Sequence, residues 1–113
     1  MQISENEVSW VLDGTPFAIK IENLEQAIFS ESQNVVVALV SENPKSQKIM
    51  IYDTTGTIRH EIEQPKDHYF NCLGSNRGED LAVMSKVKKV GWYDFWFAIN
   101  AKEGKLDELG EGR

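Results

Sequence analysis

The stretch of residues 48–63 constrains the fold of this chain more than any other part of the sequence. Apolar and polar side chains alternate in residues 48–53, which places Ile49 and Ile51 on one face of an extended strand. A turn that contains Gly56 follows, and glycine tolerates the left-handed backbone that tight turns require. An alternating strand that enters such a turn predicts the first half of a β-hairpin.

The second half of the hairpin occupies residues 57–63. There we expect Ile58, His60 and Ile62 to share one face, with Arg59 and its charged neighbours on the other. Apolar residues on one face and polar residues on the other are typical of an antiparallel strand that is covered on one side. The pattern therefore predicts an antiparallel sheet.

Further segments of this kind recur along the chain, separated by turn residues. Residues 35–40 are apolar on both faces, which is typical of a strand that is covered from both sides. Strands are expected at residues 8–13, 17–21, 26–30, 35–40, 49–53, 57–63, 68–73, 81–85, 92–99 and 105–109, with loops at 41–47 and 74–80. We predict an all-β fold: an antiparallel meander of about 8–10 strands, with propeller-blade-like repeats or arranged as a sandwich or open barrel.

Two segments also allow a helical interpretation. Asn100 can act as an N-cap for a short helix over residues 101–109, although Gly104 in its middle disfavours that helix by about 1 kcal/mol relative to alanine. A helical turn is the alternative for residues 23–26.

Length and charge limit the function classes. A chain of 113 residues is expected to form a single domain, residues 1–113, with one modest core. The formal net charge of −6 argues against binding to nucleic acid, whose usual signature is a basic patch, and it suits a basic protein partner. The single cysteine, Cys72, excludes an internal disulfide and favours the cytoplasm. The acidic N-terminus does not resemble a signal peptide, and no apolar run has the length of a membrane span.

Two segments, residues 24–63 and 67–108, are alike in the order of their strands and turns, and the hairpin at residues 8–21 matches the last half of such a unit. The final-strand pattern, IMIYDTTG in residues 49–56, resembles blades of β-propellers of the WD-repeat and related types. A propeller ring typically needs about 4–8 blades. The resemblance therefore implies that several chains, as a dimer or trimer, assemble a ring; the alternative is a plain meander.

The most aromatic stretch is residues 92–99. Alternation places Trp92, Asp94 and Trp96 on one face, while phenylalanines and a tyrosine occupy the other. One of these faces must join the core, and a second large aromatic face needs a cover of its own. Trp92, Asp94 and Trp96, together with Trp10, are therefore the predicted binding surface, since tryptophan is enriched where proteins contact one another.

Other chemistry-bearing residues are better explained by structure. His60 and His68 show no spacing of a known ligand set, so we predict no metal and no cofactor. Cys72 lies in an apolar strand and is expected to act as a small core residue. A short basic run that starts at Lys86 is expected to protect an exposed edge strand.

The expected function is therefore non-catalytic. We predict a small protein-interaction or ligand-binding protein of the immunity or adaptor kind, which forms a homo-oligomer. The alternative is carbohydrate binding by an oligomeric β-propeller with aromatic-lined clefts. A small enzyme that uses His60, His68 or carboxylates is the third hypothesis.

Overall fold

The structure of the protein, a computed structural model, describes residues 1–43, 46–76, 78–89 and 91–111. The side chains of residues 43, 76, 80, 87–89, 91–93 and 111 lie outside this description. The described residues form eleven strands and no helix, so the predicted all-β fold is confirmed. The strands are β1 (Gln2–Ser4), β2 (Glu7–Leu12), β3 (Thr15–Lys20), β4 (Leu24–Ser30), β5 (Val35–Asn43), β6 (Ser46–Asp53), β7 (Ile58–Glu63), β8 (His68–Asn76), β9 (Glu79–Lys89), β10 (Gly91–Asn100) and β11 (Lys105–Glu111).

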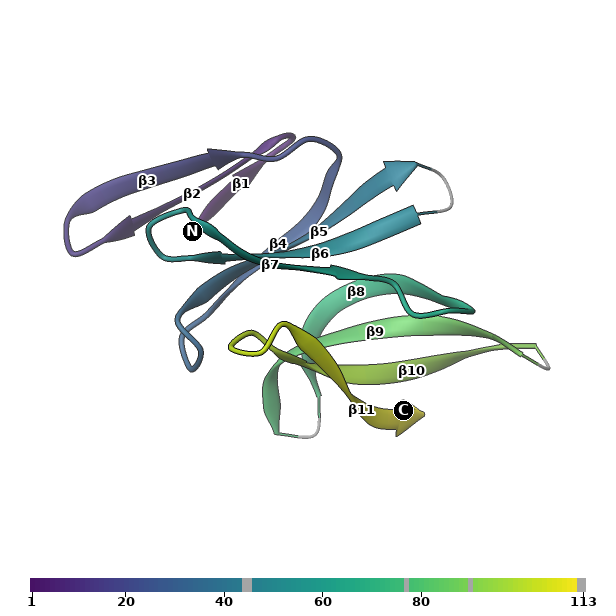
Figure 1. Ribbon diagram of the computed structural model, residues 1–113. Coiled ribbons are helices and arrows are strands. Elements are labelled where there is room, and N and C mark those ends of the chain that lie inside the picture. Colours follow the sequence, from purple (N-terminus) through teal and green to yellow (C-terminus); the bar gives the residue numbers. More distant parts are fainter. Residues whose placement is uncertain (44–45, 77, 90, 112–113) are drawn as a thin grey trace.

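The strands form three antiparallel sheets, each a simple meander of strands that follow one another in sequence. The sheets have the orders β1-β2-β3, β4-β5-β6-β7 and β8-β9-β10-β11. They lie on one another as layers, with the β4–β7 sheet in the middle (Figure 1). The two four-stranded sheets coincide with the repeated segments that begin near residues 24 and 67, and the described residues form no closed barrel.

The central strand β5 explains why the middle sheet is covered on both faces. Val37 and Leu39 join the core that the middle sheet shares with the β8–β11 sheet. Val36 and Ala38 join the second core, which packs against the β1–β3 sheet. All of residues 35–40 are buried, as their unbroken apolar sequence predicts. Burial on this scale supplies most of the driving force for folding, at about 25 cal/mol per Å² of apolar surface.

A buried glutamine fastens the middle sheet to the β8–β11 sheet. The side-chain amide of Gln47, which is 2% exposed, donates to the carbonyl oxygen of Phe70 and accepts from its backbone N–H, both at 2.9 Å. The amide thus pairs with Phe70 as a neighbouring strand would. Gln47 also donates to the carboxylate of Glu25 at 3.1 Å.

Two more glutamines of the middle sheet have related contacts. Gln33 donates to the carbonyl oxygen of Ile99 at 2.9 Å and accepts from the N–H of Ala101 at 2.8 Å. Gln26 accepts from the N–H of Leu73 at 2.7 Å. Buried backbone groups need such partners, so these contacts fix how the two sheets sit against each other.

The C-terminal segment is a strand, so the helical alternative for residues 101–109 is wrong. Asn100 accepts a hydrogen bond from the N–H of Glu103 at 3.0 Å, but it closes the turn between β10 and β11. Gly104, with φ of 69°, completes that turn. A helical turn at residues 23–26 is also absent, because Asn23 has φ of 58° and leads directly into β4.

The predicted loop at residues 74–80 is wrong in its extent. β8 continues to Asn76 and β9 begins at Glu79, so Gly74 lies inside a strand. The Trp96 ring of the same sheet lies beside this glycine, at ordinary contact distance from the position of an added Cβ. The strand β1 was not predicted at all.

Two predictions about strand faces also need correction. Lys86 does not protect an edge, because β9 lies between β8 and β10. Ile58 does not share a face with His60, because a β-bulge pairs Tyr52 with Ile58 and Ile51 with His60. The extra residue, Arg59, turns Ile58 to the opposite face, where it is 53% exposed.

Candidate functional site

The aromatic stretch in β10 belongs to the β8–β11 sheet, which turns one face away from the rest of the protein. Phe97 and Ile99 point inward and are buried in the core. Trp96 and Asp94 therefore point outward, on the face that no other sheet of the described residues covers. The register pairs Trp96 with Met84 of β9, and Met84 with Cys72 of β8.

These cross-strand rows define a continuous surface, which we call the Trp96 face. It consists of Cys72, Gly74, Met84, Lys86, Asp94 and Trp96. Its central feature is the half-buried indole of Trp96, which lies toward Gly74: a Cβ added there would be 3.9 Å from the indole Cη2. Ala82, which is opposite Gly74 in the register, is fully buried. The indole thus covers part of a sheet face over which the described part of the chain places no further sheet.

The remaining contacts of the Trp96 face are electrostatic. Lys86 and Asp94 are opposite each other in the register and form an ion pair. Burial raises the pKa of the Cys72 thiol, and the negative charge of Asp94 adds to this effect. The thiol is thus less acidic than an ordinary cysteine, which argues against its use as a nucleophile.

The structure does not bring all four predicted binding residues together. Trp10 is 6% exposed and lies in the core between the β1–β3 sheet and the middle sheet. Its indole N–H donates to the carbonyl oxygen of Thr54 at 2.9 Å, and its ring stacks on Phe17. Trp10 therefore lies apart from the Trp96 face. The side chain of Trp92 is outside the described part of the chain.

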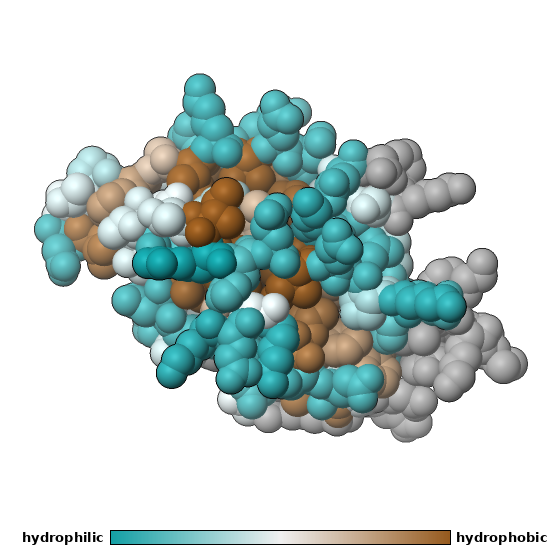
Figure 2. Space-filling model, viewed as in Figure 1, coloured by the Kyte–Doolittle hydropathy of each residue, from teal (hydrophilic) through white to brown (hydrophobic). Residues whose placement is uncertain are grey.

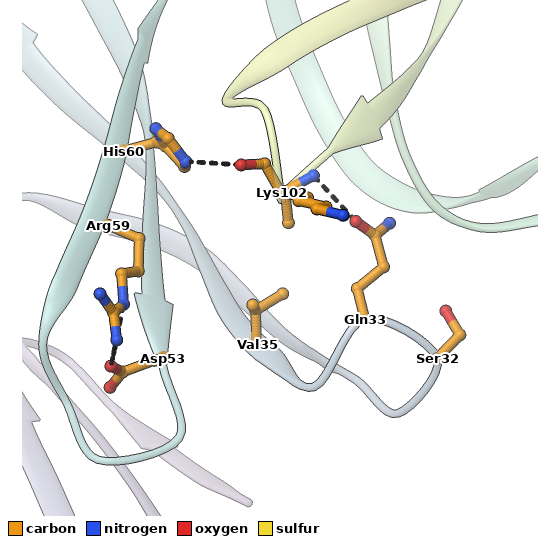
Figure 3. Close-up of a pocket in the computed structure, with 8 residues that line it drawn as sticks. Ser32, Gln33, Val35, Asp53, Arg59, His60 and Lys102 are labelled. Atoms are coloured by element: carbon orange, nitrogen blue, oxygen red, sulfur yellow. Dashed lines mark hydrogen bonds and ion pairs between the residues drawn. The ribbon is translucent and has the colours of Figure 1, made fainter.

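Apart from the Trp96 face, a cleft that the sequence did not suggest lies where turns of two sheets meet. It is a cleft of about 490 Å³ lined by residues from β5, β6, β7 and the turns before β5 and β11. Figure 3 shows that His60 reaches toward Lys102 in the turn before β11, and that Gln33, from the β4–β5 turn of the same middle sheet, reaches that turn as well. No motif predicts this cleft, because its residues are far apart in sequence.

Asp53, at one side of the cleft, forms hydrogen bonds within its own turn. Its Oδ1 accepts from the backbone N–H groups of Thr55 and Thr57, both at 3.0 Å, and from the hydroxyl of Thr55 at 2.6 Å. Its Oδ2 lies 2.8 Å from the guanidinium of Arg59. The hydrogen bond from the Thr55 hydroxyl, the two backbone hydrogen bonds and the positive charge of Arg59 together lower the pKa of Asp53 to about 2. A carboxylate held in this way stabilises a turn and is a poor general base.

His60 at the opposite side is also occupied. Its Nε2 lies 3.1 Å from the carbonyl oxygen of Lys102, and its ring packs against Gly104 so closely that a Cβ there would be 2.4 Å from Nδ1. Nε2 thus lies at Lys102 and Nδ1 against Gly104, both in the β10–β11 turn. These contacts explain Asp53 and His60 as residues that hold turns in place.

His68, the second histidine, lies at the edge of the core between the two larger sheets. Its Nδ1 lies 2.8 Å from the hydroxyl of Ser85, which donates to the carbonyl oxygen of Phe95 at 3.2 Å. Its ring contacts Phe95 and Phe97 with centroid distances of 5.4 and 5.1 Å. Ser85 is fully buried, so this serine–histidine pair has no accessible nucleophile.

The environment of His68 predicts a pH dependence of stability. Burial lowers its pKa, and the acids Asp67 and Glu108 offset this only in part. In the pH range between the lowered pKa and the ordinary value of 6.5, the unfolded chain binds a proton that the folded chain resists. The stabilising contribution of neutral His68 should therefore be complete above a pH of about 6.5, and the free energy of unfolding should decrease as the pH falls below that value.

Urea unfolding at a series of pH values between about 5 and 8 measures this effect. His68→Gln removes the titrating group, so its unfolding free energy should change less over the same range. An equal pH slope in both proteins would contradict the assignment to His68.

Within the described residues, no three side chains of histidine, cysteine, aspartate or glutamate gather into a group that would hold a metal ion. Nor do the described residues contain a helix long and apolar enough to cross a membrane. No protein-family model, curated protein or solved structure matches this chain.

Proposed function

We propose that this protein is a non-catalytic protein-interaction protein, and that it self-associates through the Trp96 face. The observation that carries the proposal is the half-buried indole of Trp96 on a sheet face that no other sheet of the described residues covers. Tryptophan and tyrosine dominate the binding energy of many interfaces. Tyr69, which the register places in the row of Lys86 and Asp94, is 38% exposed and adds a second aromatic ring.

The composition of the Trp96 face supports a protein partner. Met84 and Cys72 flank the indole with apolar surface, while the ion pair of Lys86 and Asp94 lies at one side. An apolar centre with charged groups beside it is the usual anatomy of a protein interface. The net charge of −6 favours a basic protein as a further partner, and the single cysteine suits the cytoplasm.

Trp96→Ala should weaken self-association by about 30-fold or more, since removal of a central aromatic residue often costs about 2 kcal/mol or more. Light scattering across a dilution series measures the molar mass of both proteins. Ile58→Ala is the matched control, because Ile58 is 53% exposed but belongs to β7, away from the Trp96 face.

The control variant should keep the mass of the unmodified protein at every concentration. If Trp96→Ala does not fold, Met84→Glu places a charge on the same face without removal of the indole. Unchanged association in both face variants would contradict the proposal.

A further inference from the structure

The second uncovered sheet face lies at the opposite end of the stack, on the β1–β3 sheet. In β2, Val8 and Trp10 point into the core, so Ser9 and Val11 point outward. The register places Ala18 opposite Ser9 and Pro16 opposite Val11. We call these four residues the Val11 face. Val11 is 69% exposed, and a shallow groove of about 550 Å³ runs along this face.

We propose that the Trp96 face of one copy packs on the Val11 face of a second copy, head to tail. This inference rests on the proposed function, since it names the surface that receives the Trp96 face. The partner is therefore a second copy of this chain, and each copy contributes a different sheet to the contact.

The three sheets of one chain already pack face to face in a single series, as the proposed contact between copies would. One face of the middle sheet packs on the β1–β3 sheet and its other face on the β8–β11 sheet. The Trp96 face and the Val11 face are the two faces at which such a series is uncovered, and apolar side chains are exposed on the molecular surface near the β1–β3 sheet (Figure 2). A head-to-tail contact continues the series without a new kind of packing.

Shape favours this contact over one between two Trp96 faces. The Val11 face has small side chains, Ser9, Ala18 and Pro16, beside its groove, so it has room for the exposed part of the half-buried Trp96 indole. Two Trp96 faces would instead place one large ring against another. Close packing without voids is the general requirement of stable interfaces.

Charge does not oppose the contact, although the chain carries a net charge of −6. On the Trp96 face, Lys86 and Asp94 neutralise each other. On the sheet that carries the Val11 face, Glu7 and Lys20 are opposite each other in the register. Each surface is thus balanced, and the copies can meet without the repulsion that their net charge would otherwise cause.

The two larger sheets contact each other on both sides of the stack. Gln26 of β4 accepts from the N–H of Leu73 in β8, and His60 of β7 lies against Lys102 and Gly104 in the turn before β11. Head-to-tail contacts close into a ring when the rotation between successive copies closes, and grow into a helical filament when it does not. Most oligomers of identical chains are closed, so we expect a defined multiple of the chain mass.

Mixing two variants tests the head-to-tail contact. Val11→Glu damages the Val11 face at an exposed position, and Trp96→Ala damages the Trp96 face. Each variant alone should have the monomer mass of 12.9 kDa in light scattering, because every contact needs both faces. A 1:1 mixture should form a species of twice that mass, because one undamaged face of each kind remains.

The outcomes separate this inference from the proposed function. If Val11→Glu keeps the mass of the unmodified oligomer while Trp96→Ala does not, two Trp96 faces meet and the head-to-tail contact is overturned. If the unmodified protein is a monomer at all concentrations, both proposals fail. If Trp96→Ala does not fold, Met84→Glu takes its place in the mixture. Two monomeric variants that do not associate when mixed also overturn the inference.

Discussion

Replacement of Gln47 by leucine should lower the free energy of unfolding by about 3 kcal/mol, although leucine is similar in size and more apolar. The side-chain amide of Gln47 satisfies both the N–H and the carbonyl oxygen of Phe70, and Gln47 is 2% exposed. Each buried polar group that loses its partner costs about 1–3 kcal/mol. The variant leaves both groups of Phe70 without this partner, in a place that excludes water.

Gln33→Leu is the matched comparison for Gln47→Leu. Gln33 makes the same pair of contacts with the backbone at the other end of the sheet, to Ile99 and Ala101, but it is only half-buried. Water can replace some of its hydrogen bonds, so we expect a loss of about 1 kcal/mol. Chemical denaturation measures both variants. Equal losses, or a Gln47→Leu variant as stable as the unmodified protein, would contradict the role of Gln47.

Replacement of Gly104 by alanine should cost about 2–3 kcal/mol. Gly104 has φ of 69°, where a residue with a Cβ costs about 1–2 kcal/mol. The added Cβ would in addition lie 2.4 Å from Nδ1 and 2.5 Å from Cγ of His60. The imidazole must therefore move and lose its contact with the carbonyl oxygen of Lys102, which adds about 1 kcal/mol.

Gly14→Ala separates the two causes of the Gly104 effect. Gly14 has φ of 78° but nothing lies within 4 Å of the position of an added Cβ, so only the backbone cost of about 1–2 kcal/mol applies. In a background with His60→Ala, the Gly104→Ala cost should decrease toward that of Gly14→Ala. Thermal or chemical unfolding of the four variants gives the comparison. If the cost of Gly104→Ala is the same with and without the imidazole, the packing of His60 on Gly104 is not its cause.

Much of the fold could be predicted because short-range patterns determine it. Alternation in residues 8–13 placed a strand and its inward face correctly, and the apolar sequence of residues 35–40 identified the strand that is buried on both sides. Alternation in residues 48–53 placed a strand and its inward Ile49 and Ile51, but the opposite face, with Tyr52, is buried as well. Asp53 and Gly56 marked a hairpin turn that the structure contains. These features depend on local geometry, which a sequence displays directly.

The contacts between sheets could not be predicted, because they depend on residues that are far apart in sequence. Gln47 lies in a stretch that was expected to be a loop, and nothing local shows that its amide pairs with Phe70. The bulge at Arg59, which turns Ile58 outward, has no marker in the sequence. Gly74 looked like a loop residue, and its contact with the indole of Trp96, 22 positions away, has no marker in the sequence.

The candidate site was predicted in part. Alternation correctly gave Trp96 and Asp94 one face and Phe97 the other. Trp10 could not be separated from them by sequence, because an exposed and a buried tryptophan look alike until the sheet that covers one of them is known. The assembly of a propeller-like ring, and the binding function itself, stay predictions.

The molar mass of the unmodified protein in solution, measured by light scattering across a dilution series, tests the central claim most directly. Self-association through the Trp96 face predicts a mass that is a whole multiple of 12.9 kDa, remains constant at high concentration, and falls toward 12.9 kDa on dilution. A mass of 12.9 kDa at every concentration would contradict the claim.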